Sequence, residues 1–202
     1  MPKQALIIVD VQYDFLPGGA LPVPEGDKVI PVINQLQPRY DLVVATQDWH
    51  PARHGSFASA HPGRRPGEVV ELNGLTQVLW PDHCVQGSHG AELVHELDKS
   101  RIQRIFQKGT DPGVDSYSGF FDNGRRHDTG LGDYLRQQGV SAVHVVGLAT
   151  DYCVKYTALD AARLGFETRV ILPACRGVNL QAGDVMRAVE EMRQAGVWVV
   201  ER

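Results

Sequence analysis

Apolar residues occur along the chain in short segments of strand length, separated by stretches with helical spacing. The predicted strands occupy residues 5–9, 42–46, 102–106, 140–146, 168–172 and 197–200, and the run at residues 5–9 is continuously aliphatic. Runs without polar alternation are typical of strands buried on both faces of a parallel sheet. Helical spacing of apolar positions predicts helices over residues 29–36, 92–97, 131–138, 151–164 and 184–195. This alternation predicts one α/β domain over residues 1–202, a three-layer sandwich with a central, mostly parallel sheet of about six strands and helices on both faces.

The region of about residues 47–90 interrupts the alternation. From Ala52 to Gly90 it is rich in glycine, proline, histidine and arginine and has no clean periodicity. A long irregular excursion inside a compact domain is usually functional, so something is expected to hold it in place. Its histidines are His54, His61, His83 and His89.

Composition narrows the class of protein. A length of 202 residues with 43% hydrophobic content suits one large domain, and a net charge of −4 does not favour a nucleic-acid-binding surface. No apolar run is long enough for a membrane span or a signal peptide. The odd, dispersed cysteines Cys84, Cys153 and Cys175 do not resemble a disulfide framework, which favours the cytoplasm. The sequence leaves open whether the chain is a monomer or a homo-oligomer.

Three reactive side chains follow three separate predicted strands. Asp10 follows residues 5–9, Lys108 follows residues 102–106, and Cys153 follows residues 140–146 after the turn at Gly147. A parallel sheet brings the carboxyl ends of its strands to one edge, where the three could converge. Asp10 could take the thiol proton, while Lys108 would favour a thiolate. Alternatively, each is a cap residue, a solvated charge or an inert buried thiol.

The sequence around Cys153 adds to this hypothesis. Thr150 and Asp151 are predicted to cap a helix that begins just before the cysteine. The unpaired N–H groups and partial positive charge of a helix N-terminus would stabilise a thiolate and could hold an oxyanion.

Asp48 and His50 form a second constellation. Residues two apart in an extended segment point the same way, so the carboxylate and the imidazole could bind one metal ion. His83 is the favoured third ligand, with His54, His61 and His89 as alternatives. Two histidines and a carboxylate suit zinc, manganese or iron, although such spacing alone has a high false-positive rate.

Several motifs together make the sequence similar to one family. They are residues 5–15 (ALIIVDVQYDF), 46–51 (TQDWHP), 80–87 (WPDHCVQG), 108–109 (KG) and 147–154 (GLATDYCV). With them the chain resembles the nicotinamidase/pyrazinamidase branch of the isochorismatase-like cysteine hydrolases. The resemblance covers essentially the whole chain.

The resemblance implies a catalytic triad of Asp10, Lys108 and Cys153, and a metal held by Asp48, His50 and His83. It also implies a cis peptide bond between Leu148 and Ala149, which turns the Ala149 N–H toward the substrate beside that of Cys153. His54 is left out of the metal site, because its spacing from His50 is shorter than in relatives with an additional ligand. The residues placed around the substrate ring are Phe15, Leu21, Trp80, Tyr117 and Tyr152.

The implied reaction is hydrolysis of nicotinamide to nicotinate and ammonia through a thioester on Cys153, a step of NAD salvage, with pyrazinamide as a second substrate. The implied cofactor is one divalent metal ion, zinc in the first place, with manganese and iron as alternatives. It would coordinate the ring nitrogen of the substrate.

Three other functions remain as alternatives. A hydrolase of the same fold could act on an N-carbamoyl amide, which has no evident use for the metal set, or on isochorismate, which needs no acyl-accepting thiol. A dinucleotide-binding oxidoreductase would need a glycine-rich phosphate turn after its first strand, where Asp10 and Asp14 stand instead. A non-catalytic interaction module would carry these residues without using them.

Overall fold

The protein is built on one six-stranded parallel sheet, as the apolar runs predict. The computed structural model describes residues 3–201, so Met1, Pro2 and Arg202 at the ends of the predicted domain lie outside it. The strands run in the order β5-β2-β1-β6-β7-β8. They are β1 (Lys3–Val9), β2 (Leu42–Asp48), β5 (Ile102–Lys108), β6 (Val140–Leu148), β7 (Glu167–Arg176) and β8 (Trp198–Val200).

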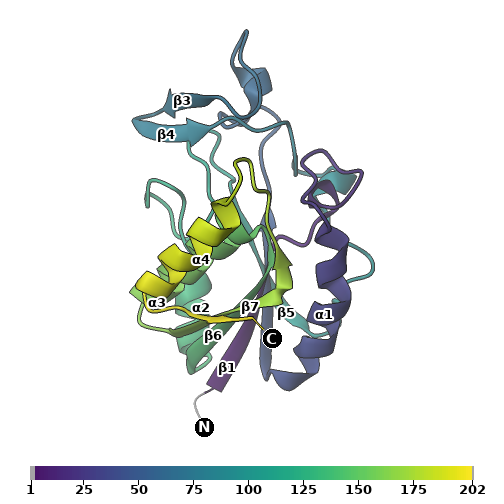
Figure 1. Cartoon of the computed structure of the whole chain (residues 1–202), viewed down its shortest axis with the longest axis vertical. Helices are drawn as coiled ribbons and strands as arrows, with labels where there is room; N and C mark the ends of the chain where they lie inside the picture. Colours follow the sequence, from purple (N-terminus) through teal and green to yellow (C-terminus); the bar gives the residue numbers. More distant parts are fainter. Residues whose placement is uncertain (1–2, 202) are drawn as a thin grey trace.

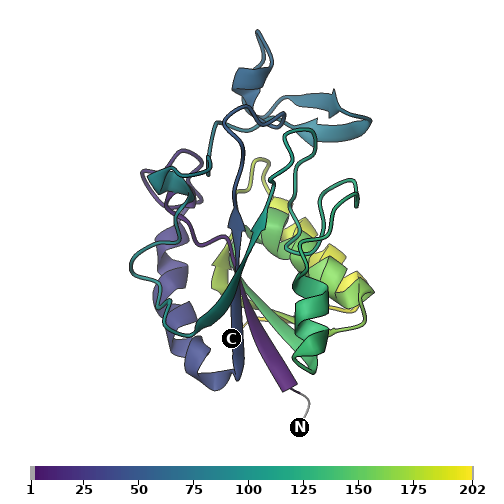
Figure 2. The same cartoon turned by 180° about the vertical axis from the view of Figure 1, so that it is seen from behind.

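Helices cover both faces of this sheet (Figures 1 and 2). Buried side chains of α1 (Val29–Leu36) pack on one face with those of β1. The other face carries α2 (Leu131–Gln137), α3 (Lys155–Arg163) and α4 (Asp184–Gln194). The predicted three-layer sandwich is therefore confirmed. No helix within residues 3–201 has the length and apolar character needed to cross a bilayer.

The strand order reverses between β1 and β6, which are neighbours in the sheet. From β1 the chain adds β2 and then β5 on one side, and from β6 it adds β7 and β8 on the other. Chain segments leaving β1 and β6 therefore diverge and open a crevice beyond their carboxyl ends. Open α/β sheets bind ligands at such a reversal.

The excursion at residues 47–90 lies beyond this edge, at the top of Figure 1. It contains an antiparallel hairpin that the sequence pattern does not predict, β3 (Val69–Leu72) with β4 (Leu75–Val78). The predicted helix over residues 92–97 is wrong. Leu93 instead forms an isolated bridge with Gln12, and the Val94 N–H donates to the Val11 carbonyl, so tertiary pairing replaces helical hydrogen bonds.

Candidate active site

Asp10, Lys108 and Cys153 converge where the strand order reverses. Asp10 directly follows β1, Lys108 is the last residue of β5, and Cys153 lies five residues beyond β6. The Lys108 Nζ is 2.9 Å from Asp10 Oδ2 and 3.5 Å from Cys153 Sγ. The three predicted strand ends thus meet in space.

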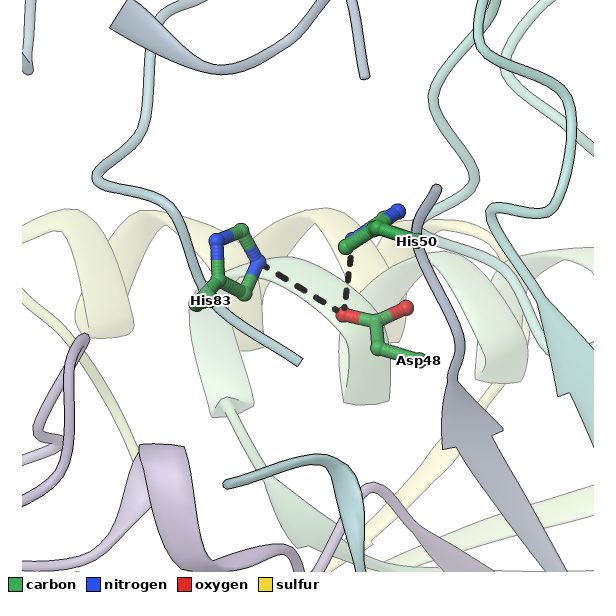
Figure 3. Close-up of side chains that lie close together, drawn as sticks. All are labelled: Asp48, His50 and His83. Atoms are coloured by element: carbon green, nitrogen blue, oxygen red, sulfur yellow. Dashed lines mark ion pairs between the residues drawn. The ribbon is translucent and has the colours of Figure 1, made fainter. Parts of the chain in front are cut away.

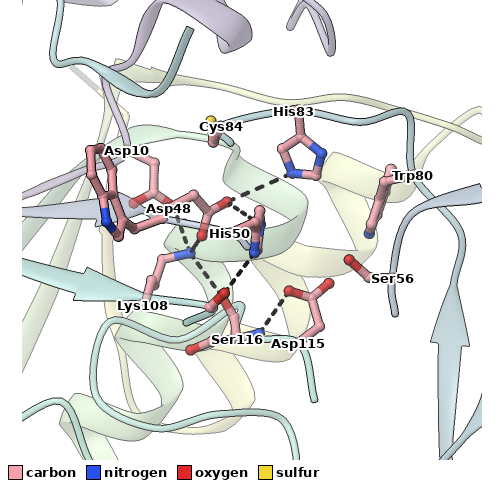
Figure 4. A network of polar contacts seen from close by, with 12 residues as sticks. Asp10, Asp48, His50, Ser56, Trp80, His83, Cys84, Lys108, Asp115 and Ser116 are labelled. Carbon is pink, nitrogen blue, oxygen red and sulfur yellow. Dashed lines mark hydrogen bonds and ion pairs between the residues drawn. The ribbon is translucent and has the colours of Figure 1, made fainter. Parts of the chain in front are cut away.

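Lys108 is the centre of this cluster, and its ammonium is fully enclosed (Figure 4). It also donates to the Asp48 carboxylate at 2.5 Å and to the Ser116 carbonyl at 2.8 Å. Burial alone would lower the pKa of Lys108, but Asp10 and Asp48 outweigh burial and raise it well above its usual value. Lys108 is therefore a permanent cation shared by two carboxylates.

Burial shifts the pKa of Asp10 and of Cys153 in the same direction, upward. Burial raises the pKa of the Asp10 carboxyl, with Lys108 opposing, and Thr46 Oγ1 donates to its Oδ1 at 2.6 Å. Burial likewise raises the pKa of the Cys153 thiol well above its usual value, again with Lys108 opposing. Burial of Cys153 therefore outweighs the stabilisation of a thiolate that we expect from a helix N-terminus.

The turn that presents Cys153 differs from a simple capped helix. A π-helical turn, Thr150–Val154, precedes α3, and no side chain caps it. The predicted capping role of Asp151 is wrong: its carboxylate accepts from the backbone N–H groups of Val178 and Asn179, 2.9 and 2.7 Å away, beyond β7. The peptide bond between Leu148 and Ala149 is cis, as the resemblance implies.

Asp48, His50 and His83 form a buried cluster with the geometry of a metal site (Figure 3). The Asp48 Oδ2 is 3.6 Å from His50 Nε2 and 3.9 Å from His83 Nε2. The Nδ1 of His50 lies 2.9 Å from the Gly109 carbonyl, and that of His83 lies 2.7 Å from the Pro81 carbonyl. A carbonyl can only accept, so Nδ1 carries the proton in both rings and both Nε2 lone pairs face the carboxylate. These donors fit a divalent metal ion.

The charges around this cluster favour a cation. Burial opposes ionisation of Asp48, but Lys108 and His50 outweigh it and lower the pKa of Asp48. Burial would lower the pKa of His50, yet Asp48 raises it, whereas burial and neighbouring His50 lower the pKa of His83 to about 4. The Asp48 carboxylate, which favours a proton on the His50 ring, also attracts a metal ion.

The alternative histidine ligands lie outside the Asp48, His50 and His83 cluster. His54 is buried beside His50 and Asp115, but its Nδ1 accepts from the Ser56 N–H at 3.2 Å, which places the proton on Nε2. The His61 Nε2 lies 2.7 Å from the Gly55 carbonyl, and His89 is exposed against Tyr13. The geometry therefore favours His83 as the third member of the cluster.

A cavity with aromatic walls opens beside Cys153. The residues predicted around a substrate ring all line it, and so do Val23, Ala149 and Val178. Trp80 meets Tyr152 edge to face, with ring centroids 4.9 Å apart. Because Cys153, Asp48 and His83 share this lining, a flat ring bound there would touch both clusters.

The sequence pattern does not indicate Asp115, which lines this cavity, or Gln77, which contacts two of its lining residues. Asp115 is buried in its wall, and its carboxylate lies within 4.8 Å of a ring nitrogen of His50 (Figure 4). Gln77, the buried residue of β4, donates at 3.1 Å both to Asp115 Oδ2 and to the Tyr117 hydroxyl. Neither residue belongs to a local motif, so a signal for them could come only from long-range contacts.

A family comparison agrees with this geometry. The family model described as the isochorismatase domain matches residues 4–202. The chain belongs to the isochorismatase family. That assignment alone is compatible with amide substrates and with isochorismate.

The relatives that the chain resembles within the isochorismatase family are nicotinamidases and pyrazinamidases. The chain is 54% identical over 200 residues to a nicotinamidase of Escherichia coli, covering 97% of this chain and 93% of the relative. A solved nicotinamidase/pyrazinamidase of Acinetobacter baumannii superposes with a TM-score of 0.96 at 47% identity, covering 100% and 97% of the two chains. A pyrazinamidase of Pyrococcus horikoshii, solved in complex with zinc, gives a TM-score of 0.79 at 41% identity, covering both chains fully.

Proposed function

We propose that this protein hydrolyses nicotinamide to nicotinate and ammonia, and hydrolyses pyrazinamide in the same way. One observation carries the proposal: a buried thiol, carboxylate and ammonium in mutual contact share a cavity with an Asp-His-His cluster. The identity to nicotinamidases across nearly the whole chain supports this choice of substrate.

Acylation begins with a proton transfer from Cys153 Sγ to Asp10. The transfer moves a negative charge from the buried Asp10 carboxylate to the buried Cys153 sulfur, so the net charge of the site does not change. Burial raises the pKa of both groups. Lys108, in contact with both, stabilises the anion on either side. The thiolate attacks the carboxamide carbon, and the backbone N–H groups of Ala149 and Cys153 hold the oxyanion. Asp10 then returns its proton to the departing ammonia as the C–N bond breaks.

Deacylation uses the same carboxylate. A thioester between Cys153 Sγ and the acyl carbon remains, and Asp10 removes a proton from the attacking water. When the C–S bond breaks, the proton goes back to Cys153 and nicotinate leaves. Lys108 stays protonated throughout, because Asp10 and Asp48 raise its pKa well above neutrality.

Asp48, His50 and His83 would hold one divalent metal ion, zinc in the first place, with manganese or iron as alternatives. When bound, the metal supplies a Lewis-acidic point for the ring nitrogen of the substrate. The chain's own contribution is to fix both imidazoles through the Gly109 and Pro81 carbonyls.

The aromatic walls would orient the ring. We assign Phe15, Leu21, Trp80, Tyr117 and Tyr152 to ring contacts, because all of them line the cavity that Cys153 shares. These contacts would place the carboxamide carbon at near-attack distance from Cys153 Sγ. We place the reaction in the cytoplasm, since Cys84, Cys153 and Cys175 are all free thiols.

The decisive measurement is ammonia release from nicotinamide, pyrazinamide and benzamide, with and without a chelator. We expect turnover of the first two, a much lower rate with benzamide, which lacks the ring nitrogen, and loss of activity on chelation. Cys153→Ala should abolish release while metal content stays unchanged. Equal turnover of benzamide would contradict coordination of the ring nitrogen by the metal. Activity retained by Cys153→Ala would contradict a thioester intermediate. Turnover of N-carbamoyl amides alone would show that the protein acts on that class of substrate instead.

A further inference from the structure

The Lys108 ammonium is surrounded by four acceptor atoms, one more than the protons it can donate. Its Nζ lies 2.5 Å from Asp48 Oδ1, 2.8 Å from the Ser116 carbonyl oxygen and 2.9 Å from Asp10 Oδ2. Cys153 Sγ is the fourth atom, at 3.5 Å. Four ligand atoms with a sulfur among them suit the tetrahedral coordination of zinc. The ammonium therefore stands where a thiophilic divalent ion could bind.

The spacing of these atoms fits an ion in place of the ammonium. Ligand atoms of Asp10, Asp48 and Cys153 all lie within 4.8 Å of one another. Zinc–oxygen and zinc–sulfur bonds are about 2.0–2.3 Å long, so the oxygens would approach by less than about 1 Å and the sulfur by slightly more. Cadmium is a larger ion of the same charge, so it requires less movement.

The charge of the position fits as well. Asp10 and Asp48 carry two negative charges when ionised, and Lys108 neutralises one of them. In the absence of the lysine, a divalent ion that displaces the Cys153 thiol proton to solvent would add the same single positive charge. Binding forms one metal–sulfur bond and breaks one S–H bond, and it leaves the net charge that the site has with lysine.

Asp48 joins this position to the Asp-His-His cluster. Figure 4 shows its carboxylate between Lys108 and the two imidazoles. Its Oδ1 contacts Lys108, whereas Oδ2 lies 3.6 Å from His50 Nε2 and 3.9 Å from His83 Nε2. A carboxylate can bridge two cations through its two oxygens, and two-metal centres hold their ions about 3.5–4 Å apart. The two positions therefore have the arrangement of a two-metal centre in which lysine fills one place.

The substrate cavity provides a way into this position. Cys153 and Asp48 both line the cavity, together with His83 of the neighbouring cluster. The Lys108 ammonium is enclosed directly behind them. An ion that enters beside the substrate would therefore meet the thiol.

We propose that Lys108 occupies the second position of a two-metal centre, and that its ammonium keeps a second divalent ion off Cys153. The nucleophile then stays free for the substrate although it lies beside a metal-binding cluster. This role concerns metal binding alone and does not depend on which amide the protein hydrolyses.

Cadmium binding to reduced, metal-free protein tests this role. Equilibrium dialysis with elemental analysis counts the tightly bound ions, and the ultraviolet charge-transfer band of a cadmium thiolate reports a bond to sulfur. We expect one ion and no band in wild type. Lys108→Met keeps the length of the aliphatic stem and leaves the position of Nζ open, so it should bind two ions and show the band.

Two further variants identify the atoms that hold the second ion. Lys108→Met combined with Cys153→Ala should lose the band and return to one ion, because the sulfur ligand is missing. Lys155→Met is the matched control, since Lys155 also pairs with a carboxylate, that of Glu191 at 3.0 Å, but on the surface between α3 and α4. It should bind one ion and show no band.

Unfolding gives a second readout, which also applies if Lys108→Met folds poorly without metal. Cadmium should raise the urea midpoint of Lys108→Met more than that of wild type, because the second ion binds only the folded state. Adding Cys153→Ala should reduce this difference.

Three results would overturn the proposal. They are a single ion without the band in Lys108→Met, a band in wild type that Cys153→Ala removes, and equal effects of cadmium on the urea midpoints of Lys108→Met and wild type. Ammonia release enters none of these measurements, so a failure here is distinct from a failure of the proposed amide hydrolysis.

Discussion

At the scale of single residues, Lys108 supplies the positive charge that two buried carboxylates share. Its ammonium contacts Asp10 and Asp48, and removing it leaves two carboxylates buried without a counter-ion. We expect Lys108→Met to abolish ammonia release and to lower the free energy of unfolding by about 3–5 kcal/mol. Urea unfolding and an ammonia assay measure the two effects.

A double variant shows whether the stability lost in Lys108→Met comes from unpaired charge or from lost packing. Adding Asp10→Asn to Lys108→Met removes one of the stranded charges, so part of the stability should return while activity stays absent. If the double variant is as unstable as the single one, the loss comes from packing around the missing amine rather than from unpaired charge.

Ionisation of Tyr40 is expected to lower the free energy of unfolding at high pH. Its pKa is raised from 10.0 to about 12, chiefly by burial. A phenol whose pKa rises on folding contributes stability below its unfolded pKa and loses that contribution as the pH climbs toward the folded value. The stability difference between wild type and Tyr40→Phe should therefore shrink by roughly 1–2 kcal/mol at about pH 11.5. Urea unfolding of both proteins on either side of pH 10 measures this, and a constant difference would contradict it.

The residues of the two predicted clusters were accessible from the sequence because each follows a buried strand or belongs to a family motif. Asp115 and Gln77 were not, since neither has a local pattern. The hydrogen bond from Gln77 Nε2 to Asp115 Oδ2 joins positions 38 apart along the chain. The raised pKa of Cys153 could not be predicted either, because the depth of burial depends on tertiary packing.

At the scale of elements, β1 and β6 approach each other closely at Gly147. Its φ is +114°, and a Cβ there would lie 2.1 Å from the Val9 carbonyl oxygen. We expect Gly147→Ala to lower the free energy of unfolding by about 3 kcal/mol or more, because strain and a backbone clash add, and to reduce ammonia release. Gly139→Ala is the matched control, with φ +72° and no heavy atom within 4 Å of the added Cβ. It should cost only about 1–2 kcal/mol. Equal losses in the two variants would show that the clash is absent.

The β3–β4 hairpin contributes one buried amide, that of Gln77, which donates to two residues lining the substrate cavity. Gln77→Glu would set a carboxylate against Asp115, where the amide now donates. We expect KM for nicotinamide to rise about tenfold or more with a smaller change in kcat, because the hydrogen bonds orient Asp115 and Tyr117 rather than reacting groups. Thr76→Ser, at the exposed neighbouring position, should leave both constants unchanged. A fall in kcat alone would argue against a positioning role.

The two local predictions that were wrong, the helix over residues 92–97 and the capping role of Asp151, share a cause. Residues 92–97 satisfy their backbone against the segment after β1, and Asp151 binds the loop after β7 rather than its own helix. Such partners lie far away in the sequence. Strands β1 and β2 were predictable because burial on both faces leaves a local apolar run.

At the scale of the whole molecule, the reversal of strand order explains why residues from three strands meet. Parallel strands forced Asp10, Lys108 and Cys153 to one edge of the sheet, which the alternation of elements already implied. The register did not follow from the sequence. The pairing of Asp48 with Lys108 across β2 and β5 joins the two predicted clusters through one ammonium, and only the assembled sheet shows it.

Metal removal tests how the excursion is anchored to the sheet. Asp48 belongs to β2, whereas His83 belongs to the irregular segment beyond β4, so a bound metal ion would tie that segment to the sheet. We expect chelation to lower amide-hydrogen protection in residues 79–88, while protection in β1 and β6 stays unchanged, because ligand binding stabilises the segments that form the site. His83→Ala should reproduce the pattern without chelator, and Cys153→Ala should not, since its thiol belongs to the other cluster. Hydrogen exchange read by mass spectrometry resolves these segments. Uniform loss of protection across the sheet would mean that the metal stabilises the whole domain, and no loss at all would place it elsewhere.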